Sequence, residues 1–577
     1  MADSPGVDRV SMIVLRAMRG PLGLLIGVYV VGIAGFGFIP GRDGEPMSFF
    51  HAVYFLSYTA TTTGFGELPS AFSNAQRMWA IVLLHVSVIA WLYSIGAIIE
   101  LLQNPHFRRA RSRRVFARRV AGTKEPFVIV CGFGDTGSLL ARALDEQGLS
   151  TVVIDNDPDR IKALSLRNFD VQMLGVCGDS GDPSVLVDAG LQHRYCAGIV
   201  AVTDDEGTNV KTTVMTRFLN ATLTPICRVE SRSCAKELDE LGNVVVLDSF
   251  EVFADRLRIA LHRPAVYALS DWLVRMPGVT LSYRPNCPSG RWIVCGYGQM
   301  GHLLEEKLLA EGVELIVIDP EIPEEKTDER HIRGPIDVDA LQRAGIGDAA
   351  GVIVATSDDA ANLRITIISR RLNAEAFVVV RQNFYLNEMV FSNLSADIVM
   401  HPDRVISRRI QLELLSPGLQ PLLEQLESDP METLEELIAR LRTALGKEPP
   451  LVWRTDLSSK SAPALVSRPG RGERSCGLRL GDLLRDPCDR EQALGCVPLI
   501  LEREGKEHRL PGPDTVLRLG DRVLFCSTRA ARRDVEASLR NPYSLEYLVS
   551  GEEVPRGYAA RFLRRYRERT EQEAEAS

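Results

Sequence analysis

The sequence lacks the features that mark several common protein classes. None of its eleven cysteines belongs to a C-x-x-C pair, and none precedes Cys131. This argues against a zinc site or a disulfide scaffold and favours reduced thiols in a cytosolic compartment. The formal net charge is -8, so the positive excess of a general nucleic-acid binder is also missing. The 577 residues allow about three or four domains of roughly 100–200 residues each.

Charge is also absent from two apolar stretches near the N-terminus, residues 22–39 and 78–99. Each is close to the about 20 apolar residues that cross a bilayer. Arginines are grouped before the first stretch and after the second, and positively charged flanks favour the cytoplasmic side. We therefore predict a multi-pass protein of the cell membrane with spans at 21–39 and 77–102 and both termini cytoplasmic.

The segment between the two spans contains a short apolar and aromatic stretch, residues 47–61, followed by Thr62-Thr63-Gly64-Phe65-Gly66-Glu67. Irregular backbone at membrane depth is tolerated only where it is buried in protein or lines a water-filled path. Glycines one residue apart can adopt positive φ, which lets successive carbonyls point the same way and replace an ion's hydration shell. The pattern predicts a re-entrant helix and an ion filter over residues 47–67.

This order of elements resembles the pore of two-helix potassium channels. The resemblance implies potassium in the filter and a homotetramer, because one chain supplies a quarter of the pore. It assigns the filter to Thr62, Thr63, Gly64, Phe65 and Gly66. Thr63 stands where valine is common, Phe65 where tyrosine is common, and Glu67 replaces the usual aspartate. The alternative is a hydrophobic hairpin that only anchors the chain.

After a basic linker the sequence repeats itself. FVIVCGFGDTG (127–137) returns as WIVCGYGQMG (292–301), and Asp155 and Asp319 each follow the third glycine by 18 residues. This is the dinucleotide-binding arrangement, in which glycines allow a tight turn, close approach of phosphate and close packing of helix on strand. The acid accepts from a ribose hydroxyl, and its charge disfavours the 2'-phosphate of NADP.

The paired repeats resemble the RCK (KTN, TrkA-N) domains of potassium channels and Trk uptake regulators. The resemblance implies a cytoplasmic gating ring that binds NAD, ADP or ATP. The implied nucleotide-binding residues are Gly132, Gly134, Asp135, Thr136, Gly137, Asp155, Asp179 and Thr203 in the first copy. In the second copy they are Gly296, Gly298, Gln299, Met300, Gly301, Asp319, Arg333 and Thr356. Either copy could instead keep its glycines for packing alone.

We therefore expect a mixed fold: an α-helical membrane pore domain, two α/β Rossmann-like RCK domains and a small C-terminal α+β lobe. The expected boundaries are 1–20 for the cytoplasmic N-terminus, 21–103 for the pore domain, 104–124 for the linker, 125–285 for the first RCK domain, 286–450 for the second with its crossover part, and 451–577 for the lobe and tail. Residues 250–275 would be a helical crossover between the RCK domains, although core packing explains them equally well.

The two copies differ after the acidic residue. We align Gly178-Asp179 with Arg333-Gly334, which places a cation in the second copy and makes Arg333 a candidate phosphate contact. Residues 320–330 (PEIPEEKTDER) look like an acidic insert, which either reshapes the ribose pocket or forms a solvated loop.

A divalent cation such as Ca²⁺ is a further candidate ligand. Asp179, Asp204, Asp205 and Glu230 lie at expected strand ends and could supply oxygen atoms. The alternative is that they cap helices or are solvated.

The leading hypothesis is a ligand-gated potassium channel whose partners are its own copies, lipid, potassium and small nucleotides, with no nucleic acid. One alternative is a membrane-anchored NAD-dependent oxidoreductase, but that needs a substrate domain and an acid or base near the nicotinamide. The sequence offers no clear His, Lys or Tyr constellation for it. Another is the regulatory subunit of a separate transporter, which would not need its own filter.

Overall fold

The computed structural model describes residues 6–66, 71–274, 288–415, 418–446, 450–466 and 477–551. Glu67, residue 275 of the predicted crossover, the predicted domain boundary at 285 and the C-terminal tail lie outside these ranges. The chain forms two compact units. The first contains residues 1–125 with two short pieces, 174–176 and 184–195, and the second contains the remainder.

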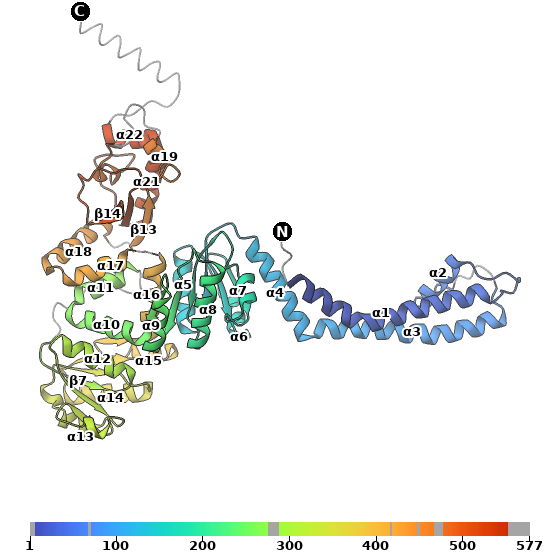
Figure 1. Cartoon of the computed structure of the whole chain (residues 1–577), viewed down its shortest axis with the longest axis horizontal. Helices are drawn as coiled ribbons and strands as arrows, with labels where there is room; N and C mark the ends of the chain where they lie inside the picture. Colours follow the sequence, from blue (N-terminus) through green and yellow to red (C-terminus); the bar gives the residue numbers. More distant parts are fainter. Residues whose placement is uncertain are drawn as a thin grey trace, which may run out of the picture. The chain divides into compact units, whose positions relative to one another are not determined.

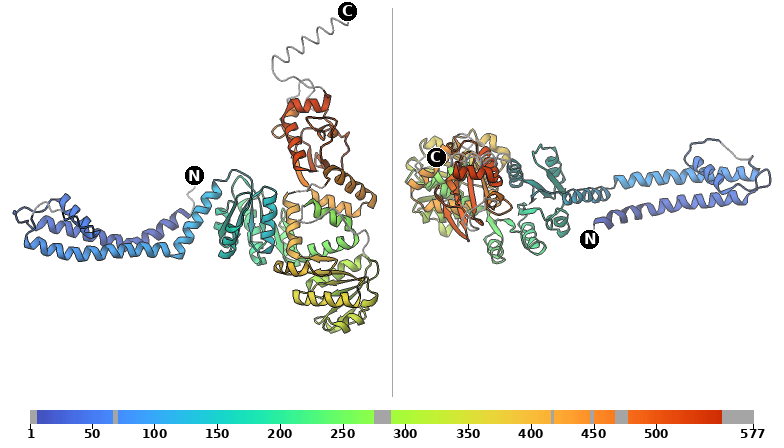
Figure 2. Two further views of the ribbon diagram at one scale, coloured as in Figure 1. Left: turned by 180° about the vertical axis from the view of Figure 1, so that it is seen from behind. Right: turned by 90° about the horizontal axis from the view of Figure 1, so that it is seen from above.

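The first unit is built on four helices: α1 (Gly6–Phe38), α2 (Phe49–Ala60), α3 (Asn74–Gln103) and α4 (Pro105–Ala121). Helices α1 and α3 lie side by side (Figures 1 and 2). By length and composition, α1 from Val14 and the whole of α3 could cross a membrane, and only 22% of each candidate span is buried. Large apolar side chains such as Ile26 and Ile89 are exposed. This is the surface expected of helices in lipid rather than of helices in a soluble core.

Small residues let the two long helices approach closely. The Trp79 indole of α3 lies against α1, where a Cβ on Gly35 would come within 2.2 Å of its ring atoms. The indole N–H donates to the carbonyl of Gly32 at 3.4 Å. Helix α2 then packs against both α1 and α3, with Leu56 buried beside Phe36. Close helix contact through glycine is typical of membrane helix pairs.

The basic linker is helical. In α4 the guanidinium of Arg113 lies 2.5 Å from the carboxylate of Asp188 and donates to the Ser184 hydroxyl at 2.7 Å. Both partners belong to α7 (Pro183–Asp188), so α4 is fixed to that short helix.

The first α/β domain has a parallel sheet in the order β3-β2-β1-β4-β5-β6. Its strands are β1 (Phe127–Cys131), β2 (Ser150–Asp155), β3 (Met173–Cys177), β4 (Cys196–Ala201), β5 (Ile226–Val229) and β6 (Val245–Asp248). Its helices are α5 (Asp135–Glu146), α6 (Pro158–Leu166), α7, α8 (Glu206–Leu219) and α9 (Arg232–Glu240). Strands β1 and β2 are buried along their whole length, as expected of a parallel sheet covered on both faces.

The second α/β domain repeats this topology, with the order β9-β8-β7-β10-β11-β12. Its strands are β7 (Arg291–Cys295), β8 (Glu314–Asp319), β9 (His331–Arg333), β10 (Gly351–Val354), β11 (Phe377–Arg381) and β12 (Ile398–Met400). Its helices are α12 (Gln299–Ala310), η1 (Glu324–Lys326), α13 (Val338–Arg343), η2 (Ile346–Asp348), α14 (Asp359–Leu372), η3 (Tyr385–Asn387) and α15 (Glu388–Phe391). The predicted repeat of two Rossmann-like domains is confirmed (Figure 1).

The two domains exchange the helix that follows their last strand. Helix α10 (Ser249–His262) leaves the first domain and buries Leu257 in the core of the second, beside Leu304. Helix α16 (Pro402–Leu415) leaves the second domain and buries Ile410 in the core of the first, beside Leu140. The predicted crossover after residue 250 is therefore present, and a second crossover returns through α16.

The remaining elements form the predicted small C-terminal lobe and its connection. They are α11 (Pro264–Leu273), α17 (Leu419–Ser428), α18 (Met431–Leu445), β13 (Leu451–Asp456), α19 (Pro463–Val466), α20 (Leu480–Leu483), β14 (Cys496–Arg503), β15 (Lys506–Arg509), β16 (Arg522–Ser527), α21 (Arg529–Arg540) and α22 (Pro542–Ser550). The four strands form an antiparallel sheet in the order β13-β16-β14-β15. Leucines of α17 and α18 pack against both this sheet and α11.

Candidate functional site

The first glycine-rich loop lies between β1 and α5, at the point where the strand order reverses. Gly132 has φ +101, and a Cβ there would lie 2.8 Å from the carbonyl of Val202. A Cβ on Gly137 would lie 1.9 Å from the carbonyl oxygen of Gly132. Gly134 caps α5, and a Cβ there would make only an ordinary contact with Arg160, at 3.5 Å. The fold therefore requires the first and third glycines, whereas the second leaves room for a phosphate at the helix N-terminus.

Asp155 ends β2 beside this loop and is buried. Its carboxylate accepts hydrogen bonds from the backbone N–H of Phe133 at 2.5 Å and of Asp157 at 2.8 Å. The guanidinium of Arg160 lies 3.6 Å from the same carboxylate and 3.5 Å from that of Asp204. Asp155 thus fixes the loop, and its role as a ribose acceptor stays a prediction.

Arg160 is a site residue that the sequence reasoning missed. Burial alone would lower the pKa of its guanidinium, but the neighbouring carboxylates of Asp155 and Asp204 raise it. It stands in the first turn of α6, where the helix dipole disfavours a cation. A basic residue at the start of the helix that follows the acidic strand end was the available signal. Its side chain is partly exposed and could reach an anion bound at Gly134.

Thr203 and Thr356 hold equivalent strand ends in place. The side-chain oxygen of Asn209 accepts from the N–H and the hydroxyl of Thr203, at 2.9 and 2.7 Å. Asn362 does the same for Thr356, at 3.1 and 2.6 Å. Each hydroxyl hydrogen is directed to the asparagine and to the carbonyl two residues on, Asp205 or Asp358, so a ligand could use only the lone pairs of the threonine oxygen.

Among the other residues predicted to contact the nucleotide, some are exposed and others are buried. Asp135 and Gln299 are the exposed first residues of α5 and α12. Thr136 and Met300, which follow them, are buried. Thr136 donates its hydroxyl hydrogen within the protein, as described below, and Met300 belongs to the core of the second domain. Asp179 is exposed, and its carboxylate accepts from the N–H of Gly181 at 2.7 Å.

The second loop has the same backbone geometry. Gly296 has φ +116, a Cβ on Gly301 would lie 2.1 Å from the carbonyl oxygen of Gly296, and a Cβ on Gly298 would meet nothing within 4 Å. Asp319 accepts from the N–H of Tyr297 at 2.8 Å and also from that of Glu321 at 2.7 Å. The two glycine-rich loops are therefore equivalent in backbone geometry and in the acidic residue that holds each loop.

The glycine after the third strand corrects the alignment of the two copies. The N–H of Gly178 donates to the carbonyl of Asp155 at 2.9 Å, and the N–H of Gly334 donates to the carbonyl of Asp319 at 3.2 Å. These glycines are equivalent, because each bonds the last residue of the neighbouring strand. The predicted alignment of Gly178 with Arg333 is wrong by one residue.

Arg333 therefore corresponds to Cys177, and Pro335 takes the place of Asp179. The side chain of Arg333 is 44% exposed and pairs with Glu324 of η1, with 2.5 Å between the charged atoms. A phosphate contact by Arg333 remains a prediction, and it would require this pair to open.

Residues 320–330 are not an insert. They connect β8 to β9 through η1, whereas residues 156–172 connect β2 to β3 through α6, so the second copy has the shorter connection. Ile322 is buried in the core of the second domain.

The His331 ring lies between Asp328 and Glu305, 2.9 and 2.8 Å from their carboxylates. Glu305 also accepts from the hydroxyl of Tyr297 at 2.8 Å, so this connection is held against the second loop. Burial and Glu305 raise the pKa of Tyr297 to about 12.

The four side chains predicted for a divalent cation are engaged separately: Asp179, Asp204, Asp205 and Glu230. Asp205 caps α8 by accepting from the N–H and the hydroxyl of Thr208, at 3.1 and 2.5 Å, and this hydroxyl contact lowers its pKa. Glu230 pairs with Arg228 at 3.1 Å. These partners fit the alternative in which the acidic groups serve as caps and ion pairs.

The segment after α2 has the backbone alternation expected of an ion filter. Thr62, Gly64 and Gly66 have φ of +58, +64 and +73, so positive φ recurs at every second residue. The N–H groups of Thr63 and Gly64 donate to the carbonyl of Tyr58 at 2.9 and 3.3 Å, which joins the segment to α2. All residues from 61 to 66 are exposed in the single chain.

Comparison with known proteins assigns both parts of the chain. The TrkA-N domain model matches residues 128–265 and 292–402, and an ion-channel model matches residues 24–104. Probable potassium channel protein 2 of Methanocaldococcus jannaschii is 24% identical over 223 residues, which cover 38% of this chain and 63% of that protein. The Ktr system potassium uptake protein C of Bacillus subtilis is 31% identical over 159 residues, covering 26% and 69%.

Among solved structures, the chain is similar to the GsuK channel bound to NAD, with a TM-score of 0.43 and 17% identity over 92% of this chain and all of that one. The chain spans less than two thirds of the curated M. jannaschii relatives, 63% of one and 58% of the other.

Proposed function

The chain belongs to the TrkA-N domain family and carries an ion-channel domain ahead of two TrkA-N domains, and on this premise we propose that it is a ligand-gated potassium-selective channel. In this proposal four copies surround one pore, both termini are cytoplasmic, and the paired α/β domains form a gating ring. The relatives named above are potassium channels and a potassium uptake protein rather than enzymes.

The observation that carries the proposal is the alternating backbone from Thr62 to Gly66. Positive φ at every second residue turns successive carbonyl oxygens to the same side, which is the geometry that replaces the hydration shell of a potassium ion. This segment follows a short helix and lies between two apolar helices that are mostly unburied. Its exposure in the single chain fits a surface that faces other copies across a pore.

The test is ion flux into liposomes that contain the purified protein, with potassium and sodium compared and NAD, ADP or Ca²⁺ added in turn. We expect potassium-selective flux in the wild type and its loss in Gly66→Ala, because alanine is strained at φ +73. Gly44→Ala is the matched control: Gly44 has φ +85, open space around it and no place in the filter. Flux that is equal in Gly66→Ala and wild type, or absent throughout, would reject the channel.

The proposed ligand is an adenine nucleotide such as NAD, ADP or ATP. Phosphate would lie at the N-terminus of α5 beside Gly134, with Asp155 accepting from the ribose and Arg160 close enough to balance charge. The same positions recur at Gly298 and Asp319 in the second copy. Bound nucleotide shifts the pore only if its affinity differs between the open and closed rings.

Alanine at the second glycine of each motif separates binding from folding. A Cβ on Gly134 or Gly298 meets no atom closer than 3.5 Å, so the fold accepts it, but the methyl group occupies the point of closest phosphate approach. We expect Gly134→Ala to keep the melting temperature and to lose nucleotide binding at the first site, measured by calorimetry. Gly298→Ala does the same for the second site. Unchanged binding in both variants would show that the loops serve packing alone.

Helix α4 is the proposed link to the pore, since it directly follows α3, the second candidate membrane span, and is fixed to α7 through Arg113 and Asp188. Neutralising Asp188 should weaken ligand control of flux while leaving nucleotide affinity unchanged.

A further inference from the structure

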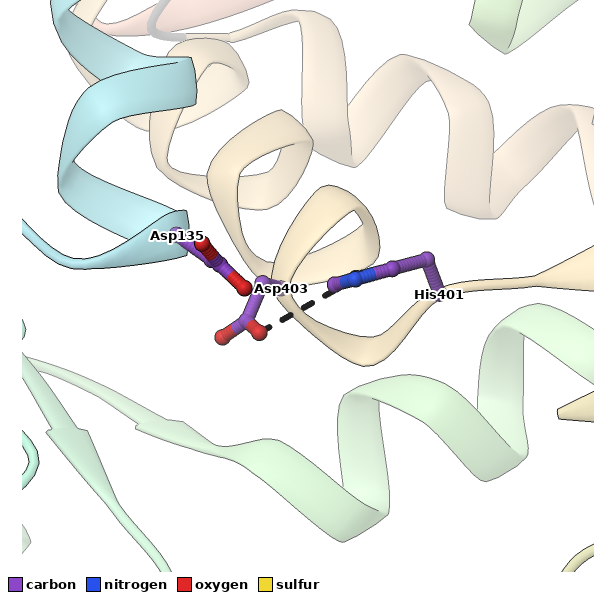
Figure 3. A group of neighbouring side chains, drawn as sticks. All are labelled: Asp135, His401 and Asp403. Atoms are coloured by element: carbon purple, nitrogen blue, oxygen red, sulfur yellow. Dashed lines mark ion pairs between the residues drawn. The ribbon is translucent and has the colours of Figure 1, made fainter. Parts of the chain in front are cut away.

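A second cluster of ligand-type side chains lies where α5 meets the crossover helix α16. Asp135, His401 and Asp403 each place one oxygen or nitrogen atom so that all three atoms lie within 4.8 Å of one another. Figure 3 shows the three side chains beside one another, with the ion pair between one carboxylate oxygen of Asp403 and the His401 ring marked. Asp135 comes from the first α/β domain, and the other two residues follow the last strand of the second.

His401 is the unusual member of this group. Its side chain is 5% exposed, and among the residues that the structure describes neither ring nitrogen has a hydrogen-bond partner. The Nδ1 atom lies 3.9 Å from the nearer carboxylate oxygen of Asp403, too far for a hydrogen bond. Buried polar groups without partners are rare, and such a group beside two carboxylates indicates a ligand-binding position.

Asp403 is held so that one oxygen stays available. Its Oδ1 accepts from the Thr136 hydroxyl at 2.5 Å and from the Arg228 guanidinium at 3.2 Å. Its Oδ2 faces His401. Hydrogen bonds of this kind orient carboxylate ligands in metal sites. The positive charges of Arg228 and the partly buried Arg381 act on the same carboxylate and oppose a cation, so a moderate affinity is expected.

We propose that Asp135, His401 and Asp403 bind a divalent transition-metal ion of the Zn²⁺ type. A neutral imidazole nitrogen with two carboxylate oxygens suits zinc and its neighbours, whereas calcium and magnesium take oxygen ligands. Asp135 is exposed, so the ion has a route from solvent and water can complete its coordination. This site differs in residues and in chemistry from the acidic strand ends considered for calcium.

The ion would join the first nucleotide loop to the second domain. Asp135 immediately follows Gly134, the position at which phosphate is expected, and α16 is the helix that returns from the second domain. Metal and nucleotide would then affect each other's affinity by the same factor, as linkage requires.

The test is calorimetric titration of the full-length protein in detergent with Zn²⁺, and with Co²⁺ followed by its visible absorption. The exposed thiols of Cys177 and Cys488 are alkylated first, so that they cannot bind the metal. We expect Asp135→Asn and His401→Gln to lower Zn²⁺ affinity by at least about tenfold. Loss of a residue that only orients a metal ligand already lowers affinity by about that factor, and these two residues are proposed as ligands themselves. Asp135 is exposed, so its variant should fold even if the variant of buried His401 does not.

The matched controls are Asp159→Asn and His508→Gln, which change an exposed carboxylate on α6 and an exposed imidazole on β15. Both should bind Zn²⁺ like the wild type. Affinity that is unchanged in Asp135→Asn, or reduced equally in the controls, would overturn the site. The readout is binding and does not depend on ion flux, so it stands or fails separately from the channel function.

Discussion

The hydroxyl of Thr136 donates a hydrogen bond of 2.5 Å to the carboxylate of Asp403, although 267 residues separate them in the chain. Thr136 is the second residue of α5, directly after the first glycine-rich loop, and Asp403 lies in the first turn of α16. The loop of one α/β domain is therefore bonded to the crossover helix of the other. A ligand that moves this loop acts on both domains.

A buried carboxylate holds the two crossover helices together, and its loss should be costly. Asp271 of α11 pairs with Arg256 of α10 and lies 2.7 Å from Arg408 of α16, with all three side chains largely buried. Burial lowers the pKa of Arg408 to about 9, and the charge of Arg256 adds to this effect. Asp271→Asn leaves two buried cations without their counter-ion, and we expect a loss of about 3–5 kcal/mol in the free energy of unfolding, measured with denaturant.

The matched control is Asp159→Asn, whose exposed carboxylate forms a surface pair with Lys162. Solvent screens a fully exposed ion pair, so this variant should unfold like the wild type. If Asp271→Asn and Asp159→Asn had the same free energy of unfolding, Asp271 would not hold the two crossover helices together.

Asp155 should determine both nucleotide affinity and the choice between NAD and NADP. Hydrogen bonds to charged groups contribute about 1.5–3 kcal/mol, so Asp155→Asn should weaken NAD binding at the first site roughly 10- to 100-fold. The same change removes the charge that repels a 2'-phosphate, so the preference for NAD over NADP should shrink. Calorimetry with both nucleotides measures this, and Asp319→Asn reports on the second site. NAD affinity equal to that of the wild type would contradict the ribose assignment.

Local patterns were sufficient to predict the glycine loops, the acidic strand ends and the two apolar helices. Gly132 and Gly137 lie five residues apart, and their close approach is set by one turn between one strand and one helix. The positive φ at Gly64 and Gly66 likewise follows from residues adjacent in sequence. Each of these features is determined within a short segment, and a short segment can be interpreted from sequence alone.

Contacts between distant segments could not be predicted in this way. Nothing near His401 in the sequence indicates that Asp135 lies opposite, because the return of α16 to the first domain depends on packing of the whole pair. The error at Arg333 has a similar origin, since the β8–β9 connection lacks the counterpart of α6 and a residue-by-residue comparison loses register there. Arg160 belongs to the helix that the second copy lacks, so the repeat gave no hint of it.

The cysteines should divide sharply by reactivity. Burial raises the pKa of Cys131 and Cys295 to about 12, whereas Cys177 and Cys488 are exposed. The thiolate is the reactive form, so a thiol with a pKa about four units above the pH reacts very slowly. Treatment of the native protein with iodoacetamide at pH 8, followed by peptide mapping, should label the two exposed residues and spare the two buried ones until denaturant is added. Rapid labelling of Cys131 would mean that the first sheet opens readily.

The third glycine of the first loop should be required for folding rather than for binding alone. An alanine Cβ at Gly137 would lie 1.9 Å from the carbonyl oxygen of Gly132, a backbone atom that cannot turn aside, so α5 would have to move away from β1. Overpacking usually costs about 1–3 kcal/mol, and a contact with rigid backbone should reach the upper part of that range. For a cooperatively unfolding domain of about 150–250 residues, we expect the melting temperature of Gly137→Ala to fall by roughly 4–12 °C. The melting temperature is measured by intrinsic fluorescence.

Two further alanine variants show whether the close approach itself is responsible. Gly301→Ala places a Cβ 2.1 Å from the equivalent carbonyl in the second domain and should melt early as well. Gly347→Ala meets nothing within 4 Å, so it should melt at the wild-type temperature or slightly above, because alanine restricts the unfolded chain. If Gly137→Ala melted at the same temperature as Gly347→Ala, α5 would not lie as close to β1 as this loop requires. The proposed phosphate position beside Gly134 would then lose its structural basis.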